Sequence, residues 1–160
     1  MESKNISIVA IVLLVFVGFF VWGYSGKQEN DLKSSLVAPE VFYDFGTISM
    51  KNGNVTKEFT VVNPTNSDIK VSTVLTSCMC TTAFVVSSDG SIKGPFRMPG
   101  MGYVPPANEI IKAGENRTIR VVYDPNAHGP AGVGQINRFV TLTDTSGGVV
   151  QLEIKALVTP

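Results

Sequence analysis

The feature that most constrains the fold of this chain is a period of two in its apolar residues, repeated in short runs after Pro39. In the last run, Val150, Leu152, Ile154 and Ala156 would share one face of an extended strand, with polar residues on the other face. Clusters of Gly, Pro, Asn and Asp separate the runs and predict turns. Strands with one dry face must pack against each other, so the pattern predicts an all-β domain.

The pattern predicts about seven or eight strands. These are Val41–Ile48, Val55–Asn63, Ile69–Thr76, Thr81–Val86, Glu109–Ile111, Arg117–Tyr123, Ile136–Asp144 and Val149–Val158. The expected core includes Phe59, Ile119, Val121, Leu152 and Ile154. The stretch Gly94–Ala107 is rich in Gly and Pro and predicts an irregular loop. Two such sheets can bury their dry faces as an immunoglobulin-like β-sandwich, and a closed barrel is the alternative.

The N-terminal run Ile6–Trp22 is apolar except for Ser7. As a helix it would span roughly 25 Å, at the short end for crossing a membrane, and aromatic residues gather at its far end. A cleaved signal peptide is the alternative, but the apolar region is long and no Ala-x-Ala-like site follows. We therefore predict an uncleaved transmembrane helix in residues 1–23, a polar linker in residues 24–38 and the sandwich in residues 39–160.

The charges around this run favour one orientation slightly. Lys4 and the terminal amine, offset by Glu2, precede the run, and charges of both signs follow it. The positive-inside rule then predicts a single-pass membrane protein whose C-terminal domain is extracytoplasmic, in the periplasm or at the cell surface.

The overall charge is balanced, with 13 basic and 13 acidic residues. Phosphate-backbone binding needs clustered Lys and Arg, so we expect no nucleic-acid partner. The sequence contains no Gly-rich phosphate loop, Gly-x-Ser-x-Gly or His-Glu-x-x-His motif. We therefore expect that the protein is not an enzyme, and we infer no small-molecule substrate.

Cys78 and Cys80 form the sharpest motif in the chain, a Cys-x-Cys pair. In an extended segment, residues two apart point to the same face, so the two thiols could chelate a soft metal such as Cu(I) or Zn²⁺. They could instead close a small-ring disulfide or remain structural thiols. The spacing leaves these three interpretations open.

Three further residues could complete a soft-metal site. Met98 and Met101 lie in one Gly/Pro-rich loop, and the sole histidine, His128, lies in another. Thioether and imidazole ligands beside two thiolates would favour copper by their softness. The candidate metal ligands are therefore Cys78, Cys80, Met98, Met101 and His128. A Cys–His nucleophile pair would also require His128 to reach one of the cysteines.

The order of several motifs resembles a bacterial family of uncharacterised secreted or membrane-anchored domains. The matching segments are Asp44-Phe45-Gly46, the strand ending at Asn63, and Ser77-Cys78-Met79-Cys80-Thr81, where the family usually has Gly in place of Met79. The resemblance extends over roughly Pro39 to Val158. It implies an immunoglobulin-like domain of the Hydin or major-sperm-protein kind. Such domains serve as binding modules, and no established catalytic activity comes with them.

Two functions follow as hypotheses. The first is a membrane-anchored binding or scaffolding module that contacts another protein of the cell envelope. The second is a copper-binding or thiol-redox protein that uses Cys78 and Cys80.

Overall fold

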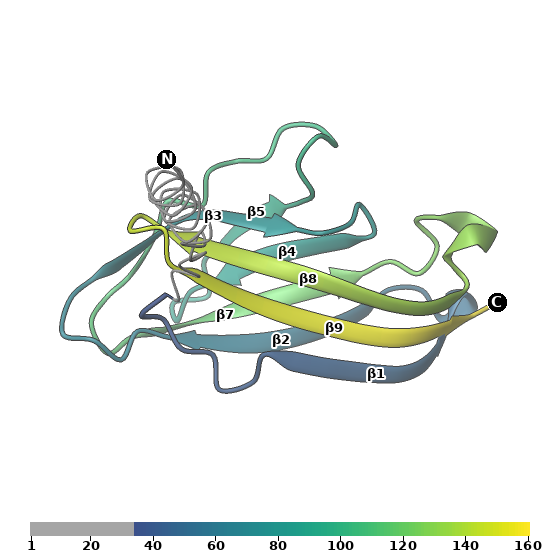
Figure 1. The fold of residues 1–160 in the computed structure, drawn as a ribbon, viewed down its shortest axis with the longest axis horizontal. Helices are drawn as coiled ribbons and strands as arrows, with labels where there is room; N and C mark the ends of the chain where they lie inside the picture. Colours follow the sequence, from purple (N-terminus) through teal and green to yellow (C-terminus); the bar gives the residue numbers. More distant parts are fainter. Residues whose placement is uncertain (1–33) are drawn as a thin grey trace, which may run out of the picture. The chain divides into compact units, whose positions relative to one another are not determined.

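The computed structural model of the chain describes residues 34–160, which form a sandwich of two β-sheets (Figure 1). Within this range the chain forms nine strands and two short 3₁₀ helices. They are β1 (Phe42–Ser49), η1 (Met50–Asn52), β2 (Val55–Val62), β3 (Ile69–Thr76), β4 (Thr81–Val86), β5 (Ile92–Phe96), β6 (Glu109–Ile111), β7 (Asn116–Tyr123), η2 (Gly129–Gly132), β8 (Gly134–Asp144) and β9 (Val149–Thr159).

The strands divide into a five-stranded sheet, in the order β1-β9-β8-β3-β6, and a four-stranded sheet, in the order β2-β7-β4-β5. Strand β1 runs parallel to β9, and the other pairs are antiparallel. The predicted sandwich is confirmed over the barrel alternative, because two separate sheets form. The long hairpin of β8 and β9 is the centre of the larger sheet.

The core lies between the two sheets and follows the period of two in the sequence. In β7, buried residues alternate with more exposed ones from Arg117 to Tyr123, and β9 shows the same alternation. The five core residues expected from the sequence are all buried, namely Phe59, Ile119, Val121, Leu152 and Ile154. Burying an aliphatic side chain of this size contributes roughly 1.5–3 kcal/mol, so these alternating faces supply much of the stability.

The strand that the sequence did not predict is β5, which begins before the expected irregular loop and ends inside it. It contains Gly94 and Pro95, two residues that disfavour a central strand. Strand β5 lies at the edge of its sheet and pairs only with β4. No described strand lies on its other side, so the missing amide hydrogen of Pro95 costs no hydrogen bond to a neighbouring strand there.

The sandwich begins before Pro39, within the range that composition assigned to the linker. Leu36 is buried in the core, and Val37 exchanges two backbone hydrogen bonds with Val62 of β2. The Ser34 hydroxyl donates to the buried carboxylate of Asp144 at 2.6 Å. Gly148 allows this approach, because a Cβ there would lie 2.6 Å from the Ser34 Cα. Polar composition hid these residues because Ser, Lys, Gln, Asn, Asp and Glu make up most of residues 24–38.

The expected transmembrane helix in residues 1–23 and most of the expected linker lie outside the described residues. Within residues 34–160, no helix has both the length and the apolar character needed to cross a membrane.

A buried cluster of charges joins the two sheets near their edges. Arg117 of β7 donates from Nε to Glu109 of β6 at 2.6 Å, and both side chains are less than a tenth exposed. Lys93 of β5 contacts the second carboxylate oxygen of Glu109 at 2.5 Å. Three strands from two sheets therefore meet at one carboxylate.

Candidate functional site

The Cys-x-Cys segment forms the connection between β3 and β4 at one end of the sandwich. The sequence predicted an extended segment here, but residues 77–80 bend, and the Thr81 amide donates to the Cys78 carbonyl at 3.1 Å. Thr76 fixes this turn from inside, because its buried hydroxyl lies 3.1 Å from the Cys78 carbonyl oxygen and 3.0 Å from that of Thr81. The turn brings the two sulfurs together, although the backbone is not a strand.

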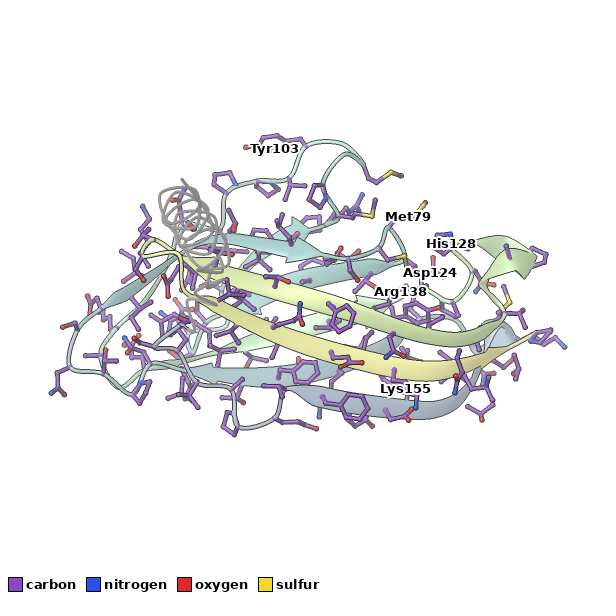
Figure 2. The ribbon with its side chains drawn as sticks, viewed as in Figure 1. Met79, Tyr103, Asp124, His128, Arg138 and Lys155 are labelled. Carbon is purple, nitrogen blue, oxygen red and sulfur yellow. A yellow bond between two sulfur atoms is a disulfide. The ribbon has the colours of Figure 1, made fainter. Side chains whose placement is uncertain are left out.

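The sulfurs of Cys78 and Cys80 are bonded to each other as a disulfide. The two cysteines differ in exposure: Cys80 is buried, with 2% of its surface exposed, whereas Cys78 is only half-buried. Met79 between them is 46% exposed and points towards solvent (Figure 2). Cys78 is therefore the less buried residue of the pair.

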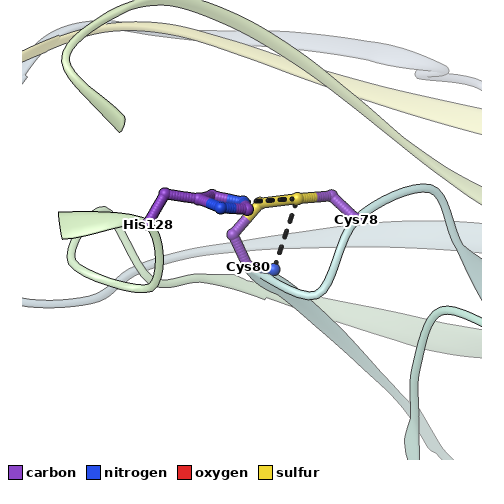
Figure 3. Close-up of side chains that lie close together, drawn as sticks. All are labelled: Cys78, Cys80 and His128. Atoms are coloured by element: carbon purple, nitrogen blue, oxygen red, sulfur yellow. Dashed lines mark hydrogen bonds between the residues drawn. A yellow bond between two sulfur atoms is a disulfide. The ribbon is translucent and has the colours of Figure 1, made fainter. Parts of the chain in front are cut away.

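His128 reaches this pair from a different loop. It lies in the connection between β7 and β8, directly before η2, and its Nε2 is 3.1 Å from the Cys78 Sγ (Figure 3). Two hydrogen bonds of Asp124 position the loop. The Asp124 amide donates to the Cys80 carbonyl at 2.8 Å, and the Asp124 carboxylate accepts the Asn126 amide at 2.8 Å. The β7–β8 loop is thus attached to the cysteine turn at its base.

Arg138 of β8 contacts the other sulfur of the pair. Its Nε donates to the Cys80 Sγ at 3.1 Å, and a second guanidinium nitrogen donates to the Asn137 carbonyl at 2.8 Å. The sequence analysis missed Arg138, because its position depends on the pairing of β8 with β3. That pairing continues past the strand as a bond from the Ser77 amide to the Phe139 carbonyl at 3.0 Å, which aligns Arg138 with the cysteine turn. Figure 2 shows Arg138, His128 and Asp124 at this end of the domain.

Two charged residues, Arg138 and Asp124, are hydrogen-bonded to the cysteine turn, Arg138 through its guanidinium and Asp124 through its backbone amide. Tyr123 lies in the same region, and burial raises the pKa of its hydroxyl; the charge of Asp124 adds to this rise, while Arg138 opposes it. The phenol is therefore neutral at physiological pH. Arg138 is the positive group that contacts a sulfur directly.

The structure brings together three of the five predicted metal ligands. The Sγ atoms of Cys78 and Cys80 and a ring nitrogen of His128 all lie within 4.8 Å of one another. Met98 and Met101 lie in the segment between β5 and β6, where Met98 is half-buried and Met101 is exposed. The Arg97 carbonyl accepts the Thr76 amide at 3.4 Å, so this segment begins beside the end of β3. A role for either methionine stays a prediction.

Two sulfurs and an imidazole nitrogen form a donor set with soft character. In the reduced state it offers two cysteine sulfurs and one imidazole nitrogen, the ligand types that soft and borderline metal ions select. In the bonded state the same sulfurs can exchange with an external thiol. The site can therefore perform metal binding or thiol–disulfide chemistry, depending on its oxidation state.

Fold and site together define a two-sheet β-sandwich that carries a Cys/Cys/His cluster on its loops. The model of a family described as "Protein of unknown function (DUF1573)" matches residues 36–91. That segment contains Asp44-Phe45-Gly46 and the cysteine turn, two of the motifs on which the resemblance in the sequence is based. No curated protein matches the chain.

Solved structures resemble the chain at the level of the fold. A protein of unknown function from Porphyromonas gingivalis W83 is 13% identical, with a TM-score of 0.55; the match covers 83% of this chain and 51% of that one. This chain thus spans about half the length of the Porphyromonas protein. A PapD-like (ASH) domain of human CEP192 is 10% identical with a TM-score of 0.49, covering 84% of this chain and 92% of that domain.

Proposed function

We propose that this protein is a membrane-anchored, extracytoplasmic binding module of the immunoglobulin-like kind, and that its loop cluster binds a copper ion as Cu(I). The observation that carries the proposal is the meeting of the Cys78, Cys80 and His128 ligand atoms within 4.8 Å. The anchor and the extracytoplasmic location rest on the apolar run Ile6–Trp22 and its flanking charges.

Charge favours Cu(I) over Zn²⁺ at this cluster. Two thiolates and a neutral imidazole around Cu(I) carry a net charge of minus one, and the Arg138 guanidinium at 3.1 Å from the Cys80 Sγ offsets that charge. Zn²⁺ with the same ligands is neutral and gains nothing from a neighbouring cation. Structural zinc sites also use four protein ligands, whereas the Cys and His groups of the described residues supply three here.

A titration of the reduced full chain in detergent with Cu(I), against a competing chelator, tests the proposal. The wild type should bind about one Cu(I) per chain, and Cys78→Ser/Cys80→Ser should lose this binding because both thiolates are gone. Met79→Leu is the matched control, since it alters the same turn but keeps both sulfurs. Equal affinity of the wild type and the double cysteine variant would refute the copper site.

The free edge of β1 supports a second function, the binding of an envelope protein by strand addition. Among the described edge strands, β5 contains Pro95 and β6 has three residues, while β2 carries Lys57 and is partly paired by Val37. Strand β1 has eight residues with neither Pro nor Lys, and Phe42 is exposed at its start. Proline and lysine are common means of protecting edge strands, and β1 has neither, although its register with β9 shifts between Asp44 and Thr47.

Crosslinking from β1 tests this second function. A photoreactive residue in place of Phe42 should capture a protein partner in native membranes, whereas one in place of Thr60, on β2 of the other sheet, should not. Identical crosslinking patterns from the two positions would argue against β1 as the docking edge.

A further inference from the structure

We infer that the Cys78–Cys80 disulfide exchanges with thiols of extracytoplasmic proteins or peptides, with Cys78 as the sulfur that is attacked and Cys80 as the leaving sulfur. This activity uses the sulfurs of the proposed copper site but does not require that the site binds copper. Its basis is the asymmetry of the two sulfurs in exposure and in charged neighbours.

Access decides which sulfur is attacked. Cys78 is half-buried beside the exposed His128 and Met79, whereas Cys80 is 2% exposed and packs in the core cluster. An incoming thiolate must approach the attacked sulfur in line with the disulfide bond, from the side away from the other sulfur. Of the two cysteines, Cys78 is the less buried residue, and its sulfur lies beside the exposed His128. Attack at Cys80 would require the core around it to open.

Charge decides which sulfur leaves well. When an external thiolate attacks Cys78 Sγ, a new S–S bond forms, the Cys78–Cys80 bond breaks, and its electron pair remains on Cys80 Sγ. The Arg138 Nε already donates to this sulfur at 3.1 Å, so the negative charge forms next to a fixed cation. Exchange is faster when the leaving thiolate is stabilised, so Arg138 acts as a positioning residue for Cys80.

A second thiol of the same substrate completes the reaction. It loses its proton to water and attacks the substrate sulfur of the mixed disulfide, and Cys78 leaves as a thiolate beside His128 Nε2. The substrate dithiol has then been oxidised to a disulfide by two electrons, and Cys78 and Cys80 have been reduced to a dithiol. With a disulfide substrate the same steps run in reverse.

The trapped intermediate tests the direction of attack. The oxidised full chain in detergent, kept free of copper by a chelator, is treated briefly with reduced glutathione, quenched with acid, and digested for mass spectrometry. The glutathionyl group should be found on Cys78. Adducts on Cys80, or equal amounts on both cysteines, would overturn the inference, and this measurement uses the wild-type chain alone.

Variants test the two causes separately. With glutathione disulfide as the probe, Cys80→Ser, which keeps Cys78, should form a mixed disulfide at least about ten times faster than Cys78→Ser, which keeps the buried Cys80. Arg138→Gln should slow reduction of the wild-type disulfide about ten-fold, and Arg138→Lys should restore part of the rate. Arg120→Gln removes an equal charge from an exposed pair on β7 and should leave the rate unchanged.

Equal rates in Arg138→Gln and the wild type would remove Arg138 from the inference, and equal rates in the two single-cysteine variants would overturn it. Because no copper is present, these outcomes are independent of the copper titration. A chain that exchanges thiols as described but binds no Cu(I) would refute the proposed copper site and leave this inference standing.

Discussion

The imidazole Nε2 of His128 lies 3.1 Å from the Sγ of Cys78, although the two residues are 50 positions apart in the chain. The contact exists because the backbone of Asp124, at the base of the β7–β8 loop, bonds to the Cys80 carbonyl. One loop thus supplies the nitrogen and the other supplies both sulfurs. A soft-metal site at this Cys-x-Cys pair requires a third ligand within reach. The His128 imidazole lies within that reach.

Replacing His128 should weaken Cu(I) binding more than replacing the two methionines. His128→Ala removes a ligand atom that already contacts a sulfur, so the dissociation constant should rise at least about ten-fold. Met98→Leu/Met101→Leu removes neutral thioethers from a neighbouring segment. Its effect on the dissociation constant should be smaller than that of His128→Ala and smaller than the loss of both cysteines. Competition with a Cu(I) chelator measures both. A larger loss in the methionine variant would show that the wrong third ligand has been assigned.

Truncating a core side chain should destabilise the domain strongly. Phe59 is 1% exposed and packs between the sheets, so Phe59→Ala should lower the free energy of unfolding by about 3–5 kcal/mol. Ile110→Ala, at a site that is 49% exposed in β6, is the control and should cost less than about 0.5 kcal/mol. Urea denaturation followed by circular dichroism measures both changes. Similar losses at the two sites would show that the buried face has been misassigned.

Two arginines of β7 should differ sharply in their contribution to stability. Arg117 forms the buried ion pair with Glu109, so Arg117→Ala leaves a buried carboxylate with less compensation and should cost about 3–5 kcal/mol. Arg120 pairs with Glu58 on the surface, so Arg120→Ala should cost less than about 1 kcal/mol. Thermal and chemical unfolding of the two variants gives the comparison. Equal losses would mean that the buried cluster does not join the sheets as described.

Acid should destabilise the sandwich through two buried carboxylates. Burial alone would raise the pKa of Asp144, but hydrogen bonds from Ser146, Ser34 and the Gly148 amide outweigh it and lower the pKa below its ordinary 3.8. Burial also opposes the ionised form of Glu109, yet contacts with Lys93 and Arg117 lower its pKa below 4.5.

Because the folded pKa values lie below the unfolded ones, both groups stabilise the fold above about pH 5. This stabilisation is lost as the pH falls through the folded values. Unfolding experiments from about pH 6 to about pH 3 should show the loss, and Asp144→Asn should reduce its steepness. A variant with an unchanged pH dependence would exclude Asp144 as a source of the effect.

The N-terminal run should remain in the mature protein. Trp22 and its aromatic neighbours suit the lipid–water interface, so the chain should fractionate with membranes and keep its N-terminus. Intact mass spectrometry after membrane extraction decides this. A mature chain that starts near Gly26 would instead indicate a cleaved signal peptide.

The sequence by itself determined the all-β class, most of the strands and the faces that they bury. These properties follow from a period of two, which is local and can be read residue by residue. It also determined which residue types could bind a soft metal. Strand β5 was not predictable, because Gly94 and Pro95 are tolerated only where a strand lies at an edge, and edge positions depend on the topology.

The tertiary structure decided which of these residues meet. His128 joins Cys78 and Cys80 because a backbone bond holds two distant loops together, and Arg138 contacts Cys80 because β8 pairs with β3 in one register. Neither arrangement has a signal along the chain, since both depend on hydrogen bonds between segments far apart in sequence. The period of two defines faces, whereas the register between strands defines the site.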